Sequence, residues 1–355
     1  MTAQSQADGP AGTEGAPVRT GIVGLGKMGI SHYAILNAHP DVDLVAITDT
    51  NPFLTTALKK HAKVEVFKDF KRMIDDKNLD AILIATPTKT HFEIARYALD
   101  RGLHTFLEKP FTLTLDEGRT LLDLASKKGV VNQVGFHNHF IGTFAEVRRL
   151  VKSGAIGDLY HVEGEAYGQV VTKPKASTWR SKKSEGGGCL HDYASHVVDL
   201  MNWVAGPPIK VLGAYLNSIF SEGVDDAVFA TFDYGNGMSG QLTTNWSDTT
   251  YRKMTTRITV NGRKGKIVAD RQEVRVFLTA GNAVDGYDEG WTIKYITDLQ
   301  PPVWYYLRGE EYSAQIDTFV SNIKSGNLEG ENRFASAYQT DEVLEMIQKA
   351  DRARS

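Results

Sequence analysis

The sequence predicts a protein of two domains, an α/β domain with a parallel sheet followed by an α+β domain with a large, mostly antiparallel open sheet. In residues 18–140, short apolar strands alternate with helical segments, a pattern typical of parallel sheets with right-handed crossovers. In residues 141–355, apolar and polar residues alternate along strands that are joined by hairpin turn signals. A glycine-rich turn directly after the first strand is the third observation.

The composition is that of a globular protein. The chain has 355 residues, 41% apolar and 23% charged, enough for about two domains. The formal net charge of -3 shows no basic bias, so we expect neither nucleic acid nor a membrane as a partner. A single cysteine cannot form an internal disulfide, and we place the protein in the cytoplasm. Residues 1–17 predict a disordered polar tail without the features of a secretory signal.

The first strand and the turn after it predict a dinucleotide-binding site. An apolar strand over 18–24 runs into Gly24-Leu25-Gly26-Lys27-Met28-Gly29, and a helix over 30–38 follows. Gly24 permits a tight turn, Gly26 lets a pyrophosphate approach the backbone, and Gly29 lets the helix pack closely on the strand. The helix N-terminus offers N–H groups and a positive dipole to phosphate. The predicted cofactor contacts in this loop are Gly24, Gly26, Lys27, Met28 and Gly29.

An acidic residue at the end of the second strand strengthens the motif. The strand over 42–48 ends at Asp49, where a carboxylate accepts hydrogen bonds from the ribose hydroxyls of the adenosine. No arginine or lysine follows in Thr50-Asn51-Pro52 to hold a 2′-phosphate, so the sequence favours NAD over NADP. We therefore predict a Rossmann dinucleotide-binding domain over residues 18–140.

The remaining elements of this domain continue the alternation. We predict helices over 53–61, 70–76, 91–100 and 115–128, and strands over 64–67, 81–85, 104–107 and 130–136. Ligands of such sheets bind at the carboxyl ends of the strands. Thr86-Pro87-Thr88 and Glu108-Lys109-Pro110 follow two of these strands. The glutamate and the lysine are candidates for chemistry, with a surface salt bridge as the plain alternative.

The second half predicts a sheet with one face for helices and the other for a partner. A helix is predicted over 144–152, and strands over 159–167, 211–219, 227–234, 238–246, 257–260 and 266–269. Hairpin turn signals lie at 234–237 and 261–265. Two amphipathic helices, over 311–324 and 335–352, are expected to pack back on the first domain. We assign residues 141–355 to a substrate-binding and oligomerisation domain.

One glycine-rich stretch of the second half gathers reactive side chains. Residues 186–196 contain three consecutive glycines, Cys189, His191, Asp192 and His196, and an apolar helix is predicted to follow. In a continuous helix Asp192 and His196 share one face. A zinc site is disfavoured because Cys189 and His191 lie close together and no second cluster supplies ligands, so we predict no metal. A Cys189 nucleophile is disfavoured too, since its neighbours are glycine and leucine.

The assembled motifs resemble the Gfo/Idh/MocA family of glucose-fructose oxidoreductase and inositol dehydrogenase. The resemblance covers nearly the whole chain from Val18, and its motifs are the dinucleotide fold, Glu108-Lys109-Pro110, Trp179-Arg180, Gly186-Gly187-Gly188 and Asp192-x-x-x-His196. It implies a nicotinamide cofactor and redox chemistry on a hydroxyl or ketone of a sugar or cyclitol. It also implies homodimers or homotetramers built through the second sheet.

The resemblance further implies roles for single residues. Lys109 corresponds to the family's catalytic lysine, and Asp192 and His196 to its Asp/His pair. We assign His196 as the base, Lys109 as the charged donor to the substrate oxygen, and Asp192 to orient the imidazole. The other predicted cofactor contacts are Asp49, Thr86, Pro87, Thr88, His91, Glu108 and Lys109. The predicted substrate contacts are Lys109, His137, His139, Trp179, Arg180, His191, Asp192 and His196.

Several interpretations stay open at this point. His137, His139 and the Trp179-Arg180 pair are equally compatible with purely structural roles. His139 stands where many family members carry an arginine, and His191 where an aliphatic residue is common, so both bear on the substrate. The leading hypothesis is an NAD-dependent dehydrogenase of a sugar, glycoside or cyclitol, with C3 of a glucoside as one candidate position. An NAD-dependent glycosidase that oxidises transiently and then eliminates, and a non-catalytic NAD-responsive regulator, are the alternatives.

Overall fold

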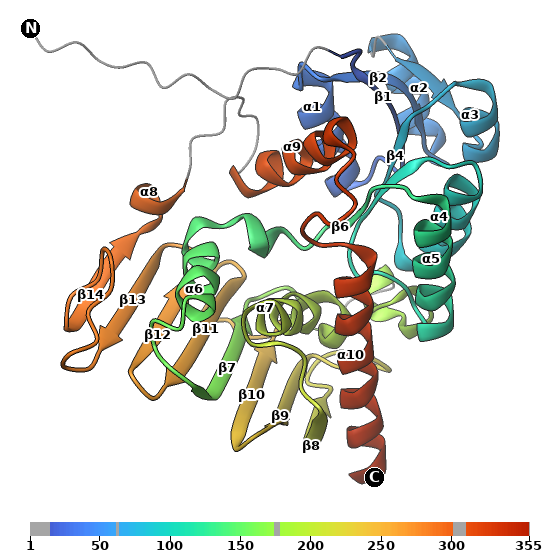
Figure 1. The fold of residues 1–355 in the computed structure, drawn as a ribbon. Helices are drawn as coiled ribbons and strands as arrows, with labels where there is room; N and C mark the ends of the chain where they lie inside the picture. Colours follow the sequence, from blue (N-terminus) through green and yellow to red (C-terminus); the bar gives the residue numbers. More distant parts are fainter. Residues whose placement is uncertain (1–14, 62–63, 174–177, 301–309, 355) are drawn as a thin grey trace, which may run out of the picture.

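The chain forms two sheets, each with its own helices, in a computed structural model that describes residues 15–61, 64–173, 178–300 and 310–354 (Figure 1). Of the predicted tail, only residues 15–17 lie within the described part of the chain. Within that part, no helix is long and apolar enough to cross a membrane. The two predicted sheet classes are both confirmed.

The first sheet is parallel throughout and has the strand order β3-β2-β1-β4-β5-β6. Its strands are β1 (Val18–Val23), β2 (Val42–Thr48), β3 (Glu65–Phe67), β4 (Ala81–Ile84), β5 (His104–Leu107) and β6 (Asn132–Val134). The helices between them are α1 (Lys27–Ala38), α2 (Pro52–His61), α3 (Phe70–Asp76), α4 (His91–Asp100) and α5 (Leu115–Lys128). The reversal of strand order between β1 and β4 opens a crevice at the carboxyl ends of the strands, where ligands of such folds bind.

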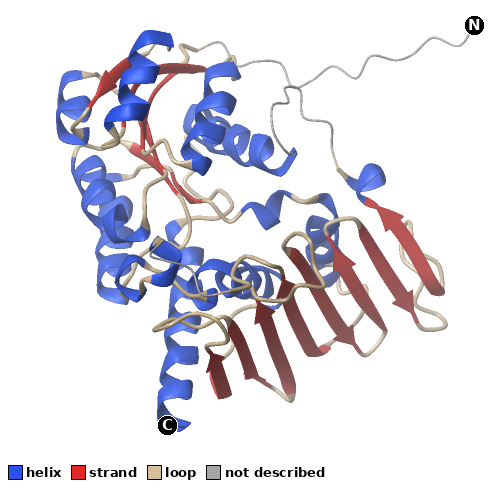
Figure 2. Ribbon diagram, turned by 180° about the vertical axis from the view of Figure 1, so that it is seen from behind, coloured by secondary structure: helices blue, strands red, loops and turns tan. Residues whose placement is uncertain are grey.

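The second sheet has the order β14-β13-β12-β11-β7-β10-β9-β8, and only its β7 and β10 run parallel. Its strands are β7 (Leu159–Tyr167), β8 (Lys210–Asn217), β9 (Ala227–Gly235), β10 (Met238–Asn245), β11 (Thr255–Gly262), β12 (Gly265–Asp270), β13 (Glu273–Leu278) and β14 (Gly290–Tyr295). The helices α6 (Gly142–Lys152) and α7 (Ser195–Ala205) lie on the side that faces the first domain (Figure 2). The short α8 (Ile296–Leu299) follows β14.

The last two helices return to the first domain. Side chains of α9 (Glu310–Ser325) share one apolar cluster with β1, β2 and α1. The start of α10 (Phe334–Arg354) joins a second cluster with α4 and α5 on the other side of the parallel sheet. Further along, α10 packs against β8 of the second sheet. The two helices therefore connect both sheets, and they cover the segments over which helices were predicted.

Two details of the sequence-based assignment are wrong. The strand predicted over 130–136 is reduced to β6 (Asn132–Val134), and the Val134 N–H and the Phe136 backbone oxygen bond to Asn332 instead of to a further strand. Strands β13 and β14 were not predicted. In β13 the buried positions alternate regularly with half-buried ones, whereas β14 has no buried position and carries exposed aromatic residues. An exposed edge strand gives little of the apolar signal on which such predictions depend.

Candidate active site

A cleft of about 840 Å³ lies at the carboxyl ends of the parallel strands and is bounded by residues of both domains. The turn after β1, the ends of β2, β4 and β5, and the segment after β6 form the side of the first domain. The loop before α7 and the start of that helix close the other side. The predicted site residues that line the cleft are Gly24, Gly26, Lys27, Met28, Asp49, Thr86, Pro87, Thr88, Glu108, Lys109, His137, Trp179, Arg180, Asp192 and His196.

The glycine turn has the shape that a pyrophosphate requires. Gly24 has a φ of 92°, and a Cβ there would lie 2.6 Å from the Ala85 carbonyl oxygen. A Cβ on Gly29 would lie 1.9 Å from the carbonyl oxygen of Gly24, so this residue is needed for packing and does not line the cleft. A Cβ on Gly26 would meet no atom of the described part of the chain within 4 Å, so this side of the turn is open there.

The start of α1 is free to bind an anion. Gly26 is the N-cap residue, and no side chain of the described residues caps the helix. The first N–H groups of an α-helix have no partner within the helix. Since they lie beside an open glycine position in the cleft, they fit the phosphates of a dinucleotide.

Asp49 holds the glycine turn in place. Its Oδ2 accepts a hydrogen bond from the Leu25 N–H at 2.6 Å, and its Oδ1 accepts one from the Asn51 N–H at 2.7 Å. A carboxylate offers about four lone-pair positions, so acceptor capacity remains for ribose hydroxyls. The residues present therefore fit an NAD molecule, with the phosphates at Gly26 and the adenosine ribose at Asp49.

Lys109 and Asp192 form a buried ion pair between the domains. The Lys109 Nζ lies 2.8 Å from the Asp192 Oδ1 and 3.0 Å from the Asp192 backbone oxygen. Arg180 donates to the other carboxylate oxygen, Asp192 Oδ2, at 2.9 Å. Burial alone would raise the pKa of Asp192, but the charges of Lys109 and Arg180 and their hydrogen bonds lower it to about 2. The carboxylate is thus an anion that fixes two cations at the edge of the cleft.

The predicted contact between Asp192 and His196 is absent from the described structure. Residues Leu190–Ala194 form a π-helical turn, and α7 begins only at Ser195. Both carboxylate oxygens of Asp192 are directed to Lys109 and Arg180. The assignment of Asp192 as the group that orients His196 is therefore wrong, because the two neighbouring cations attract the carboxylate more strongly than a neutral imidazole does.

His196 is a neutral imidazole at the cleft. Its Nδ1 is buried and has no hydrogen-bond partner among the described residues. Burial lowers the pKa of His196 well below its usual 6.5, and the positive charges of Lys109 and Arg271 act in the same direction. The ring packs edge-on against His137, with the two ring centroids 4.8 Å apart.

Three predicted site histidines, His91, His139 and His191, do not line the cleft. His91 is fully buried behind it, with its ring nitrogens 3.0 Å from the Thr86 oxygen and 3.1 Å from the Pro110 oxygen. It connects the two cleft-forming loops and contacts no open space. The prediction that His91 contacts the cofactor directly is therefore not supported by its position.

His139 also points away from the cleft. Its Nε2 lies 2.8 Å from the Asp199 Oδ2, and its ring stacks on Trp203 with centroids 4.1 Å apart. Burial would lower the pKa of His139, but the carboxylates of Asp199 and Glu331 raise it. The structure thus gives His139 a structural role as a buried partner of two acids.

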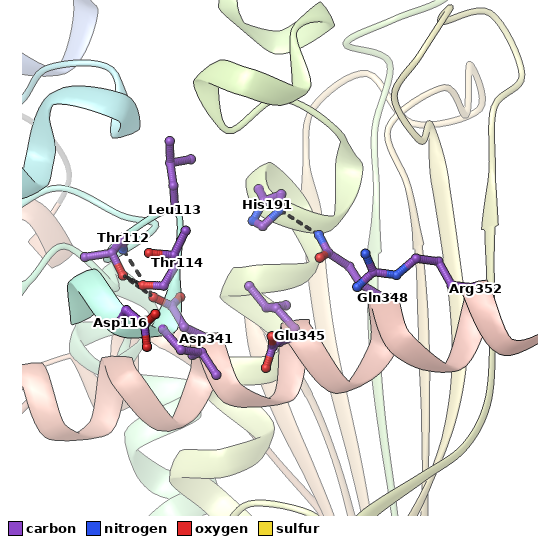
Figure 3. A pocket seen from close by; sticks show the side chains of 11 residues that line it. Thr112, Leu113, Thr114, Asp116, His191, Asp341, Glu345, Gln348 and Arg352 are labelled. Atoms are coloured by element: carbon purple, nitrogen blue, oxygen red, sulfur yellow. Dashed lines mark hydrogen bonds between the residues drawn. The ribbon is translucent and has the colours of Figure 1, made fainter. Parts of the chain in front are cut away.

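His191 faces a second, smaller pocket of about 320 Å³ beside α10 (Figure 3). Its Nε2 lies 3.0 Å from the Gln348 Nε2. Burial and the charges of Lys183 and Lys109 lower the pKa of His191 to about 4. Neighbouring residues of a helical turn point in different directions, so His191 and Asp192 serve different pockets.

Glu108 and Cys189 have buried partners. The Glu108 Oε1 lies 2.6 Å from the Nε2 of His32 on α1, a residue that no sequence motif singles out. Cys189 is fully buried, with its Sγ 3.4 Å from the Thr244 Oγ1, and burial raises its thiol pKa well above the usual range. Such a thiol is inert at neutral pH.

No cluster of three or more potential metal ligands occurs in the described residues.

Several other residues that line the cleft were not predicted from the sequence, among them Tyr193, Met254 and Tyr312. The ring of Tyr312 stacks on His137 with centroids 5.0 Å apart. Tyr193 adjoins Asp192 and could have been found there, whereas Tyr312 lies far along the chain in α9 and has no local motif around it.

A Rossmann domain with an open glycine turn and Lys109, joined to a second domain that brings Asp192 and His196 to the same cleft, defines the class of NAD-dependent oxidoreductases. Residues 18–136 match the oxidoreductase family with an NAD-binding Rossmann fold, and residues 144–268 match the C-terminal domain of the same family. The chain belongs to the Gfo/Idh/MocA family.

Several characterised proteins are similar to the chain. It is 26% identical to the myo-inositol 2-dehydrogenase of Thermotoga maritima over 87% of this chain and 89% of that protein. It is 29% identical to the D-glucoside 3-dehydrogenase of Escherichia coli, over 62% and 68% of the two chains. The structure of a levoglucosan dehydrogenase with NADH and levoglucosan has the same fold, with a TM-score of 0.83, 24% identity, and 96% and 98% of the chains covered.

Proposed function

We propose that the protein transfers a hydride between a secondary hydroxyl of a sugar, glycoside or cyclitol and NAD. The observation that carries the proposal is the placement of the Lys109–Asp192 pair and His196 in one cleft with the open glycine turn. NAD, when bound, supplies the hydride acceptor. The names of the similar inositol and glucoside dehydrogenases support a polyhydroxylated substrate.

Three side chains stabilise charge, accept the proton and position the ammonium. An ammonium has three donors, and Lys109 directs its Nζ at the Asp192 carboxylate and at its backbone oxygen. One N–H bond therefore remains for the substrate oxygen, where it stabilises the negative charge that develops as the hydroxyl loses its proton. Neutral His196 accepts that proton. Asp192 holds the ammonium in place.

A screen of inositols, monosaccharides, glycosides and nucleotide sugars for NADH formation at 340 nm tests the proposal. We expect net NADH formation with at least one of these substrates. A glycosidase that recycles its cofactor would release the aglycone without net NADH. A regulator would give neither NADH nor product with any saturating sugar, which would contradict the proposal.

The lowered pKa of His196 predicts the pH dependence of oxidation. A base is active when unprotonated, so activity is lost only as pH falls through the pKa of the free enzyme, which burial holds well below 6.5. We expect kcat/KM to stay level as the pH falls from 8 through 6.5, and to decline only at lower pH. His191→Gln is the matched control and should leave the profile unchanged. An acid limb at or above pH 6.5 that disappears in His196→Asn would contradict the assignment.

Asp49 predicts the choice between the two dinucleotides. Its negative charge repels the 2′-phosphate of NADP, so wild-type protein should bind NAD more tightly. Asp49→Asn keeps an acceptor oxygen for the Leu25 N–H and removes the charge. We expect this variant to reduce the preference for NAD at least about tenfold in titrations followed by tryptophan fluorescence. Equal or tighter binding of NADP by the wild-type protein would overturn this interpretation of Asp49.

The outer face of the second sheet supports a homodimer or homotetramer. Tyr215 and Phe229 are cross-strand neighbours, and each is 42% exposed on this face. Trp291 and Tyr295 add two more exposed aromatic rings on β14. Because β14 lies at the opposite edge of the sheet from β8 and β9, these residues form two separate exposed apolar areas, and exposed apolar surface is typical of interfaces. We expect sedimentation velocity to show an oligomer, and Tyr215→Glu combined with Phe229→Glu to give monomers; a monomeric wild type would exclude this assembly.

A further inference from the structure

We infer that Arg271 is a positioning residue that fixes the proton of His137 on Nδ1, so that His137 donates a hydrogen bond into the cleft. Its use toward a substrate oxygen rests on the proposed function. The proton position itself does not, because it follows from the contacts of the two side chains. The inference adds a donor of defined direction to the site formed by Lys109 and His196.

The contact between Arg271 and His137 determines the tautomer. The Arg271 Nη1 lies 3.2 Å from the His137 Nε2. A guanidinium has only donors and stays protonated, so the Nε2 of His137 must be the acceptor. A neutral imidazole has one acceptor and one donor nitrogen. The donor is therefore Nδ1.

The surroundings keep His137 neutral. The charged and titratable groups that face it are Arg271 from the turn after β12, Lys109 after β5, His196 on α7, His139 on its own segment, and Tyr312 on α9. In the described structure no carboxylate contacts its ring. Burial lowers the pKa of His137 well below 6.5, and the charges of Arg271, Lys109 and His139 add to this effect.

Arg271 is itself held on its other side. Its Nη2 donates to Glu311 at the start of α9, and the side chains are 38% and 13% exposed. The turn that carries Arg271 is fixed by Asp270, whose Oδ1 accepts from the Gln272 N–H at 2.8 Å. The guanidinium thus bridges a turn of the second sheet, a helix packed on the first sheet, and the segment after β6. Its Nη1 remains available to donate to His137.

The second nitrogen of His137 is available to a ligand. The ring lies between Tyr312 and His196, and the residue lines the cleft. Its Nδ1 has no partner within the described part of the chain, yet it is not among the buried polar atoms that lack one. This nitrogen therefore lies at the surface of the cleft, where it presents an N–H.

The arrangement favours substrates with two neighbouring oxygens. Lys109 and His196 act on the oxygen that is oxidised, and His137 offers a donor to a second one. The His137 and His196 rings are close enough, with centroids 4.8 Å apart, to meet adjacent oxygens of one polyol. A substrate without the second oxygen would leave the N–H of His137 unpaired, and we expect it to bind about tenfold more weakly.

Nuclear magnetic resonance of the full-length protein, labelled with 15N-histidine, tests the tautomer directly. The His137 signals are assigned from their loss in His137→Phe. We expect protonated Nδ1, unprotonated Nε2 and no titration between pH 8 and about 6. Arg271→Met should give a mixture of tautomers and a higher pKa for His137. Arg275→Met removes an ion-paired arginine of the neighbouring strand β13, whose partner is Glu273, and should change nothing.

Two results would overturn the inference. One is a wild-type His137 that carries its proton on Nε2, a measurement that needs no variant to fold. The other is an Arg271→Met protein with native circular dichroism and unchanged 15N shifts. With the best substrate of the NADH screen, His137→Phe should raise KM about tenfold with little change in kcat. A fall in kcat alone would contradict the donor role. If no sugar of the NADH screen is a substrate, the 15N measurement of the His137 tautomer still decides the inference.

Discussion

Lys109→Ala is expected to lower kcat at least about a hundredfold, because the variant loses the charged donor that stabilises the developing alkoxide. NADH binding should stay nearly intact, since the glycine turn and Asp49 do not depend on this side chain. Stopped-flow or steady-state absorbance at 340 nm measures the first quantity, and fluorescence titration the second. His196→Asn should reduce turnover to a similar extent, because it removes the base.

The chain offers a matched control for Lys109. Lys89 lies near the same cleft, pairs with Glu185 at 3.0 Å, and is 47% exposed. Lys89→Ala removes a lysine with an acidic partner but without access to the reacting oxygen, so turnover should be unchanged. A Lys109→Ala protein that turns over its substrate at the wild-type rate would remove Lys109 from the mechanism.

Gly26→Val should weaken NADH binding at least about a hundredfold without unfolding the protein. Gly26 has a φ of -63°, which any residue adopts, and a Cβ there meets no atom of the described residues within 4 Å. The added side chain therefore occupies only the space where the pyrophosphate approaches. Titration with NADH and thermal unfolding measure the two effects separately.

Gly29→Ala provides the contrasting case for the same turn. Its Cβ would lie 1.9 Å from the Gly24 carbonyl oxygen, so the strand and the helix would have to separate. We expect this variant to lower the unfolding temperature, or to fail to fold, in addition to losing NADH. Normal NADH affinity in Gly26→Val would show that the cofactor does not pass over this side of the turn.

Local motifs carry the part of the site whose position could be predicted from the sequence. The turn from Gly24 to Gly29 is one continuous stretch of sequence. Asp49 lies beside it because β1 and β2 are neighbouring strands of the parallel sheet. Lys109 and Asp192 come from different domains, and the family resemblance brought them together. Their ion pair is visible only in the structure.

The predictions failed where the direction of a side chain depends on distant neighbours. His139 is drawn to Asp199, and His191 to Gln348, contacts that span 60 and 157 residues. Arg271 reaches His137 across 134 residues. No periodicity or short motif records such contacts, because each is created by the packing of elements that are remote in sequence.

The return of α9 and α10 to the first sheet affects how the protein is made. Before these helices are synthesised, a nascent chain of residues 18–136 has β6 without its partner Asn332 and lacks Ile316, Phe319 and Phe334 over its apolar faces. Folding of this domain must therefore wait for contacts between ends of the chain that are nearly 300 residues apart, and such long loop closures are slow. A fragment that stops at residue 300 should emerge as an aggregation-prone intermediate rather than as an isolated NAD-binding domain.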